Sequence, residues 1–331
     1  MNKEFSSDRL KTARMALGLS MEDLSMRVNR IVSRQSIHAY ETNRMKPKAA
    51  VLEKLAQALG ISPQYLEGKS LLLNIPALRS IGSSPLTPEE AKEMEEMIAF
   101  KAERYISLER KTGMMREFVN PLQSLTVADR ENAETAAGIL RERWQMGISS
   151  ITSVCRLLER KGIKIIEAAL PHKVLGLSTW CEEKYPLIIM NNDKELTTTE
   201  RTRFTAVHEL GHLLLNIPQK CDKERLCNQF AGCFLLPKEL MYEEIGIKRD
   251  FITFEEAVDL HLEYGVSVSA LIHQAWDLRI ISREHYDYWF DNIISKNRSE
   301  EGWGSYPAHL ENIIGKEKRM QAISEQIDKM K

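Results

Sequence analysis

Cysteine is scarce in this chain of 331 residues, which contains five in all. Their number is odd and no two form a C-x-x-C pair, so disulfides are not expected and the cysteines are predicted to be small buried apolar groups. No apolar run approaches the roughly 18 residues of a membrane-spanning helix, and no charged-then-apolar leader opens the sequence. We therefore expect a cytoplasmic protein that does not engage a membrane.

An excess of charge of either sign is also absent, because 46 Lys and Arg face 47 Asp and Glu, for a net charge of −1. The amino-terminal segment is nevertheless basic: residues 1–70 carry 12 Lys and Arg against 7 Asp and Glu, a local charge of +5. The asymmetry indicates that two parts of the chain have different partners. The length also exceeds what one hydrophobic core usually organises, so two or more domains are expected.

The chemistry is concentrated in residues 205–215, where His208 and His212 lie four residues apart among apolar helix-forming residues. Residues at this spacing share one face of an α-helix, so both imidazoles can bind one metal ion. Glu209 follows the first histidine and can take a proton from water that the metal activates. This is the H-E-x-x-H arrangement of zinc peptidases, and it predicts a zinc site. The alternative is a helix that carries two surface histidines by chance.

The amino-terminal residues 7–66 carry the caps and apolar spacing of five short helices. Ser20 and Ser33 are predicted N-caps, Pro47 is expected to begin the fourth helix, and Ser62 with Pro63 opens the fifth. The segment resembles the Xre/Cro-like helix-turn-helix domain of phage and bacterial repressors. The resemblance is carried by Leu24, residues 33–37, Tyr40, Glu41, Lys46, Pro47, Leu55, Ala56 and residues 59–62.

That resemblance implies a third helix that enters the major groove of double-stranded operator DNA. The implied base-reading residues are Arg34, Gln35 and Ser36, and the implied phosphate contacts are Arg44, Lys46 and Lys48. A homodimer is expected by analogy, because such readers commonly pair two half-sites. The alternative is a five-helix protein-interaction module with a solvated basic face.

The middle of the chain shows a linker followed by helices. Residues 80–85 have linker composition and predict a hinge near residue 80. Thr87, Pro88 and Glu90 then predict the capped start of a helix that reaches about Lys111. Two more helices are expected at 127–144 and 149–161.

From residue 163 the pattern changes to three short strands, predicted at 163–166, 176–180 and 187–190, which precede the metal-binding helix. This is the plan of zincin-type peptidases, in which an edge strand holds an extended substrate by β-pairing. We therefore expect an extended polypeptide substrate that lies near 176–180 or near 187–190.

Two histidines leave a catalytic zinc site one protein ligand short. Residues 224–237 have a helical apolar stripe, and Glu224 lies in the first turn, where it could equally be a favourable first-turn acid. Asp222 and His261 are rival ligands. The lone histidines His172, His261, His273, His285 and His309 are predicted to be surface or core residues.

The motif at residues 208–212 and the segment 224–237 together resemble the ImmA/IrrE family of metallopeptidases. Residues 201–204 and 266–271 also match, and the similarity covers roughly residues 140–285. The resemblance implies that Glu224 is the third zinc ligand. Cys227 stands where the family usually has alanine.

We therefore predict an α+β, mainly helical protein. Its expected parts are a five-helix helix-turn-helix domain (1–70), a linker and helical connector (71–139), a zincin-like zinc peptidase domain with a small sheet (140–290), and a helical or loose tail (291–331).

The predicted function is a DNA-binding transcriptional regulator whose zinc endopeptidase cleaves a regulatory, repressor-like protein. Zinc would be bound by His208, His212 and Glu224, with Glu209 as the general base. The alternative is a non-catalytic DNA-binding repressor or antitoxin whose peptidase fold is a structural or sensing module.

Overall fold

The computed structural model describes residues 5–68, 86–171 and 174–330. The amino-terminal helices are α1 (Ser7–Ala16), α2 (Met21–Arg27), α3 (Arg34–Glu41), α4 (Ala49–Leu59) and α5 (Pro63–Leu66). The middle of the chain forms α6 (Pro88–Thr112), α7 (Arg130–Arg143), α8 (Val154–Arg160), β1 (Lys164–Ala168), β2 (Gly176–Cys181), β3 (Tyr185–Asn191), α9 (Thr199–Leu214) and α10 (Lys223–Leu235). The rest forms α11 (Lys238–Glu244), α12 (Phe254–Tyr264), α13 (Val268–Asp277), α14 (Arg283–Asn292), the short 3-10 helix η2 (Ile294–Lys296) and α15 (Gly315–Lys329).

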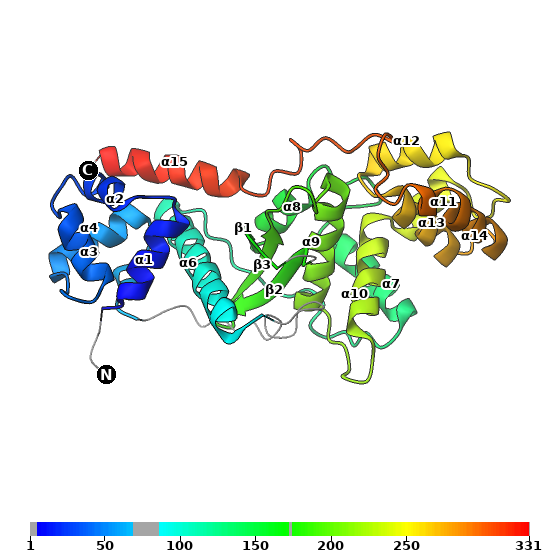
Figure 1. The fold of residues 1–331 in the computed structure, drawn as a ribbon. Helices are drawn as coiled ribbons and strands as arrows, with labels where there is room; N and C mark the ends of the chain where they lie inside the picture. Colours follow the sequence, from blue (N-terminus) through cyan, green and yellow to red (C-terminus); the bar gives the residue numbers. More distant parts are fainter. Residues whose placement is uncertain (1–4, 69–85, 172–173, 331) are drawn as a thin grey trace.

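The molecule is elongated, with α1–α5 at one end, the sheet in the middle and α11–α14 at the other end (Figure 1). The prediction of a mainly helical α+β fold with a small sheet is confirmed. The predicted hinge near residue 80 lies outside the described residues. No helix among the described residues is both long and apolar enough to span a membrane.

Helices α1–α5 surround a core of fully buried apolar side chains that includes Leu10, Leu24, Ile37 and Leu55. Serines begin four of these helices, and each accepts a hydrogen bond from the backbone N–H three residues further on, which stabilises the helix start.

The prediction that Pro47 begins the fourth helix was wrong. Lys48 is in an extended conformation and forms the N-cap of α4, which begins at Ala49. The first helical hydrogen bond runs from Leu52 N to Lys48 O at 2.9 Å, so Pro47 lies just outside the helix. Its fixed φ suits the extended approach to the helix as well as it would suit a helical position.

The sheet has the strand order β1-β3-β2, with β3 in the centre. Strand β1 pairs with β3 in parallel and β2 pairs with β3 antiparallel. Because both sides of β3 are occupied, an extended substrate cannot pair with residues 187–190, and that half of our expectation is wrong. Within the described part of the chain β2 pairs with β3 alone, so a substrate near residues 176–180 stays a prediction.

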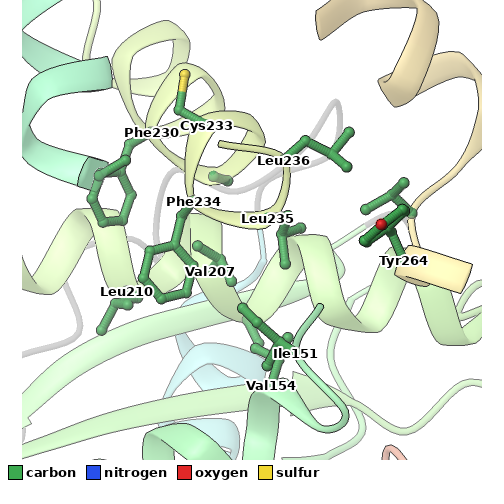
Figure 2. Packing of buried hydrophobic residues seen from close by; sticks show 14 of the residues in the cluster. Ile151, Val154, Val207, Leu210, Phe230, Cys233, Phe234, Leu235, Leu236 and Tyr264 are labelled. Carbon is green, nitrogen blue, oxygen red and sulfur yellow. The ribbon is translucent and has the colours of Figure 1, made fainter. Parts of the chain in front are cut away.

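The α9–α10 pair forms the centre of the larger core. Figure 2 shows Phe234 of α10 projecting towards Val207 and Leu210 of α9, and all three side chains are fully buried. Phe230 stacks on Phe234 with ring centroids 6.0 Å apart. Truncating a buried aromatic side chain of this kind to alanine typically costs about 3–5 kcal/mol, so the pair is held firmly together.

Helix α6 connects the two halves of the molecule through its two faces. Phe100 enters the amino-terminal core, where its ring lies 6.0 Å from that of Tyr65. Tyr105 and Ile98 enter the core that covers the outer face of the sheet. One helix therefore belongs to both hydrophobic cores.

The carboxy-terminal residues, for which the sequence left a helical or a loose state open, form α15, which runs back along α6 towards α2 (Figure 1). Met320 is fully buried against the sheet core. Arg104 pairs with Glu317 at 2.9 Å, and Lys111 pairs with Asp328 at 2.6 Å. The helix thus packs on the element that links the two halves.

A buried polar cluster lies where α6, α8, β1 and α15 meet. Glu109 forms ion pairs with Lys164, at 3.0 Å, and with Lys316. Tyr105 donates a hydrogen bond to Glu159 Oε1 at 2.8 Å. Burial nevertheless raises the pKa of Glu159 from 4.5 to about 7, because the charged carboxylate loses its hydration there.

We expect Glu159→Gln to weaken the pH dependence of stability. Between the unfolded pKa of 4.5 and the folded pKa of about 7, the native state keeps a proton that the unfolded state has released. Wild-type stability should therefore fall as pH rises from 5 to 8, by up to about 3 kcal/mol more than that of the variant. Urea unfolding at both pH values measures this difference. The exposed Glu183→Gln variant is the matched control. If Glu159→Gln leaves the change in unfolding free energy between the two pH values the same as in the wild type, the expectation is contradicted.

Candidate functional site

Helix α9 holds the H-E-x-x-H residues by burying its opposite face. Thr198 caps the helix by accepting a hydrogen bond from Arg201 N. Val207 and Leu210 are fully buried, so His208 and His212 lie at the edge of the core with only 14% and 15% of their side chains exposed. The helical spacing therefore places both imidazoles side by side, as the sequence predicted.

Helix α10 brings Glu224 to the two histidines. At Gly211 of α9 an added Cβ would lie 3.2–3.3 Å from Cys227 and Phe230 of α10, so the absence of a side chain permits the close approach of the helices. Asp222 is the N-cap of α10 and accepts a hydrogen bond from Arg225 N. Glu224 follows in the first turn and faces α9.

Three side chains converge at this point. His208 Nε2 and His212 Nε2 lie 3.0 Å apart. The carboxylate oxygens of Glu224 lie 3.2 Å from His208 Nε2 and 3.3 Å from His212 Nε2. Ligand atoms around a tetrahedral zinc ion are also separated by about 3.3 Å, given bonds of roughly 2.0–2.1 Å. Two imidazoles and one carboxylate in this arrangement fit a zinc ion.

The electrostatics of the cluster favour a cation. Burial, assisted by His208, lowers the pKa of His212 to about 4, so this imidazole is neutral at pH 7 and its lone pair is available. His208 Nδ1 is buried without a hydrogen-bond partner among the described residues, and His212 Nδ1 lies 3.5 Å from Cys227 Sγ. Close approach of three lone-pair donors is most easily explained by a cation between them.

Glu209 directly follows His208, lies between the two histidines in sequence, and is 7% exposed. Its Oε2 accepts a hydrogen bond of 2.6 Å from Ser178 Oγ on β2. Burial raises the pKa of Glu209, while the Ser178 hydrogen bond opposes this effect. A carboxylate with a raised pKa and a fixed orientation suits a group that takes and returns a proton.

Among the described residues this cluster is the one group of three or more His, Cys, Asp or Glu side chains with suitable spacing for a metal ion. The rival ligands lie elsewhere. Asp222 is committed to capping α10, and His261 is buried with its Nδ1 2.6 Å from Val266 O. The roles of His208, Glu209, His212 and Glu224 stay predictions, although the structure brings all four together.

The other lone histidines have no part in this cluster. His285 accepts hydrogen bonds from Ile252 N and from the Trp289 indole, while His273 and His309 are exposed. His172 lies outside the described residues.

Sequence reasoning overlooked the contribution of β2. Gly176, Ser178 and Trp180 are its half-buried residues and alternate with buried ones. Gly176 packs directly on α9, where an added Cβ would lie 2.7 Å from Thr205 Cγ2 and 3.2 Å from Glu209 Cγ. The signal in the sequence was a pair of small residues, Gly176 and Ser178, on one face of a predicted strand.

We expect Gly176→Ala to destabilise the protein by about 1–3 kcal/mol, because the new methyl group overlaps Thr205 and pushes against Glu209. Gly138→Ala is the matched control: Gly138 lies within α7 with nothing near its would-be Cβ, and the change should stabilise by about 0.5–1 kcal/mol. Thermal unfolding of both variants tests the pair. Equal effects in the same direction would show that β2 does not pack on α9 as closely as described.

The candidate DNA-binding face surrounds the start of α3. Arg34 and Gln35 are its first two residues and are exposed, whereas Ser36 is half-buried and its hydroxyl lies 3.1 Å from that of Ser33, the N-cap. The exposed Arg44, Lys46 and Lys48 follow between α3 and α4. Their contacts with DNA stay predictions.

The orientation of α3 is set from two sides. The buried Arg14 of α1 grips Glu41 at the end of α3 with two hydrogen bonds of 2.6 and 2.8 Å. In the connection before α3, Asn29 and Arg30 adopt left-handed conformations with φ of 54° and 56°. These two residues make the turn that a glycine would commonly make.

The fold and the two candidate sites define a protein with a helix-turn-helix DNA-binding domain and a peptidase-like α+β domain. Residues 10–66 match the helix-turn-helix family model, and residues 158–275 match the peptidase M78 model described as an IrrE N-terminal-like domain. The chain therefore joins an Xre-like helix-turn-helix domain to an IrrE/ImmA-like domain, and this predicted architecture is confirmed. No curated protein matches the chain.

Proposed function

We propose that this DNA-binding protein is a transcriptional regulator whose IrrE-like domain is a zinc-dependent endopeptidase. The observation that supports the proposal most is the convergence of His208, His212 and Glu224 within 4.8 Å of one another, with the buried Glu209 beside them. A structural zinc site usually has four protein ligands, whereas three ligands next to a base are typical of hydrolysis.

Each residue has a distinct role in this proposal. His208, His212 and Glu224 would hold zinc, which supplies Lewis-acid chemistry towards water and the scissile carbonyl. Glu209 takes a proton from the attacking water and returns it to the leaving amine. Ser178 donates to Glu209 Oε2 and keeps that carboxylate oriented.

The proposed substrate is a regulatory, repressor-like protein that presents an extended segment. Among the described residues strand β2 pairs with β3 alone, and it contacts the metal helix through Gly176 and Ser178, so a segment paired with its other edge would pass beside Glu209. A peptidase joined to an operator-binding domain meets other regulators at the same DNA. The amino-terminal domains would pair as a homodimer on two half-sites.

The zinc content of the purified chain provides a first test. We expect about one zinc per chain, lost in His208→Ala and in Glu224→Ala because each removes one of three ligands. Glu209→Gln should keep the zinc and lose cleavage of a protein substrate by at least about 100-fold, since it removes only the base.

The Glu209→Gln result separates the proposal from its alternative, a repressor or antitoxin with a non-catalytic metal module. Unchanged regulatory output in Glu209→Gln cells would favour that alternative. If the wild-type protein contains no zinc after metal-replete purification, the proposed zinc site itself is wrong.

Binding to DNA selected from a random duplex pool tests the α3 assignment. Arg34→Ala and Gln35→Ala should each reduce discrimination between selected and random DNA by roughly 10-fold or more, because a bidentate base contact contributes about 1–3 kcal/mol. Lys48→Ala should instead weaken both affinities equally and lower the salt dependence. Intact sequence selectivity in Arg34→Ala and Gln35→Ala would show that α3 is not the recognition helix.

A further inference from the structure

A groove of about 1940 Å³ extends from the candidate metal site towards the far end of the molecule. Its floor is made by α9 and α10, which contribute Phe204, Asn228 and Gly232 among others. Its far wall comes from α13 and α14, which lie beyond α10 in Figure 1. The proposed chemistry at the metal site uses none of these wall residues.

The groove reaches the candidate metal site at Glu224, which is the proposed ligand that lines it. On α9, Phe204 lies one turn before His208 and shares its face. On α10, Glu224, Asn228 and Gly232 are spaced four residues apart, and all three line the groove. At 1.5 Å per residue the path from Glu224 to Gly232 is about 12 Å long. Asn228 lies midway and is exposed, so its amide is suitably placed to bind a peptide backbone.

The far wall carries an aromatic cluster, which we define as Trp276, Tyr286 and Phe290. The ring centroids of Trp276 and Tyr286 lie 4.8 Å apart, and those of Tyr286 and Phe290 lie 4.4 Å apart. All three are half-buried and line the groove. Arg283 stacks over both Trp276 and Tyr286, at 5.4 and 5.5 Å from the ring centroids, and helps to hold them in place.

Aromatic rings that pack against one another at the wall of a groove favour one kind of occupant. Their hydrated apolar surface is released from water only when another apolar or aromatic side chain covers it, and such ring pairs add about 0.5–1.5 kcal/mol beyond simple burial. The polar Asn228 between the cluster and the metal site suits a backbone rather than a lipid or a flat ligand. A peptide with a bulky apolar side chain matches both features.

We propose that the aromatic cluster is a specificity subsite, which binds an aromatic or bulky aliphatic side chain of the substrate at a fixed position several residues from the scissile bond. This inference rests on the proposed peptidase function. The 12 Å path along α10 ends at Gly232 and not at the cluster, so it sets only the scale of this distance: an extended chain advances roughly 3.3 Å per residue and spans such a path in three or four residues. Cleavage is thus directed to extended segments that carry such a residue at a fixed distance from the cut.

The test uses the full-length, zinc-loaded chain and a library of peptides derived from a digested proteome, with cleavage sites mapped by mass spectrometry. Phe, Tyr, Trp or Leu should be enriched at one fixed position several residues from the cut, on one side of it. For a peptide chosen from that set, Tyr286→Ala should reduce kcat/KM by about 10-fold, as expected for loss of one apolar contact.

Tyr288→Ala is the matched control, because Tyr288 lies on the same helix, is 54% exposed and does not line the groove. It should cleave like the wild type. Zinc content and DNA binding report whether Tyr286→Ala is folded. A second test changes the peptide instead of the protein. Replacing its enriched residue by alanine should lower the kcat/KM of the wild type by a similar factor. The same replacement should lower the kcat/KM of Tyr286→Ala little further.

The possible failures are distinguishable. If the wild type cleaves peptides without such enrichment, the subsite is wrong but the proposed peptidase is not. The same holds if Tyr286→Ala and Tyr288→Ala give the same enrichment around the cut. Absence of cleavage by the wild type, or cleavage that Glu209→Gln retains, overturns the proposed peptidase and the subsite with it.

Discussion

The packing of α10 on α9 is the interaction on which the candidate site depends. Glycine at 211 lets Cys227 and Phe230 approach the backbone of α9. Phe230 and Phe234 then anchor the helix pair in the main core. Only this close approach carries the first turn of α10 to the two imidazoles, so that Glu224 comes within 3.2–3.3 Å of both. The same packing leaves the outer faces of the two helices as the floor of the groove.

The sheet contributes to the site by a second close approach. Gly176 allows β2 to pack closely on α9, and Ser178 then donates a hydrogen bond to the buried Glu209. A buried carboxylate without a hydrogen bond would cost several kcal/mol, and the Ser178 hydroxyl offsets part of that cost. The proposed base and the strand proposed to hold the substrate are therefore parts of one packed unit.

The DNA-binding and IrrE-like domains are joined by packed helices as well as by the chain that connects them. Helix α6 supplies Phe100 to one core and Tyr105 to the other, and α15 packs along α6 through Met320 and through ion pairs such as Arg104–Glu317. Because Glu109, Lys164 and Lys316 are buried at this junction, separating its elements would expose or strand charged groups. Rigid packing of this kind places the proposed peptidase at a defined position relative to the DNA.

Local signals explain which elements could be predicted. The serine caps of the amino-terminal helices, the Thr87–Pro88 start of α6, and the apolar strands each depend on residues close together in sequence, so their positions were correct within a few residues. Likewise, the spacing of His208 and His212 needs only helical geometry to bring them together. Pro47 was misplaced because its φ suits both a helix start and an extended approach.

What the sequence by itself determined is therefore most helices and strands up to α10, the two domain types and the paired histidines. Tertiary structure decided the rest: that Glu224 rather than Asp222 or His261 lies beside the histidines, that β3 is the central strand of the sheet, and that Ser178 binds Glu209. These relations join residues on different elements. They follow from how side chains fill the space between α9, α10 and the sheet, which no local pattern encodes.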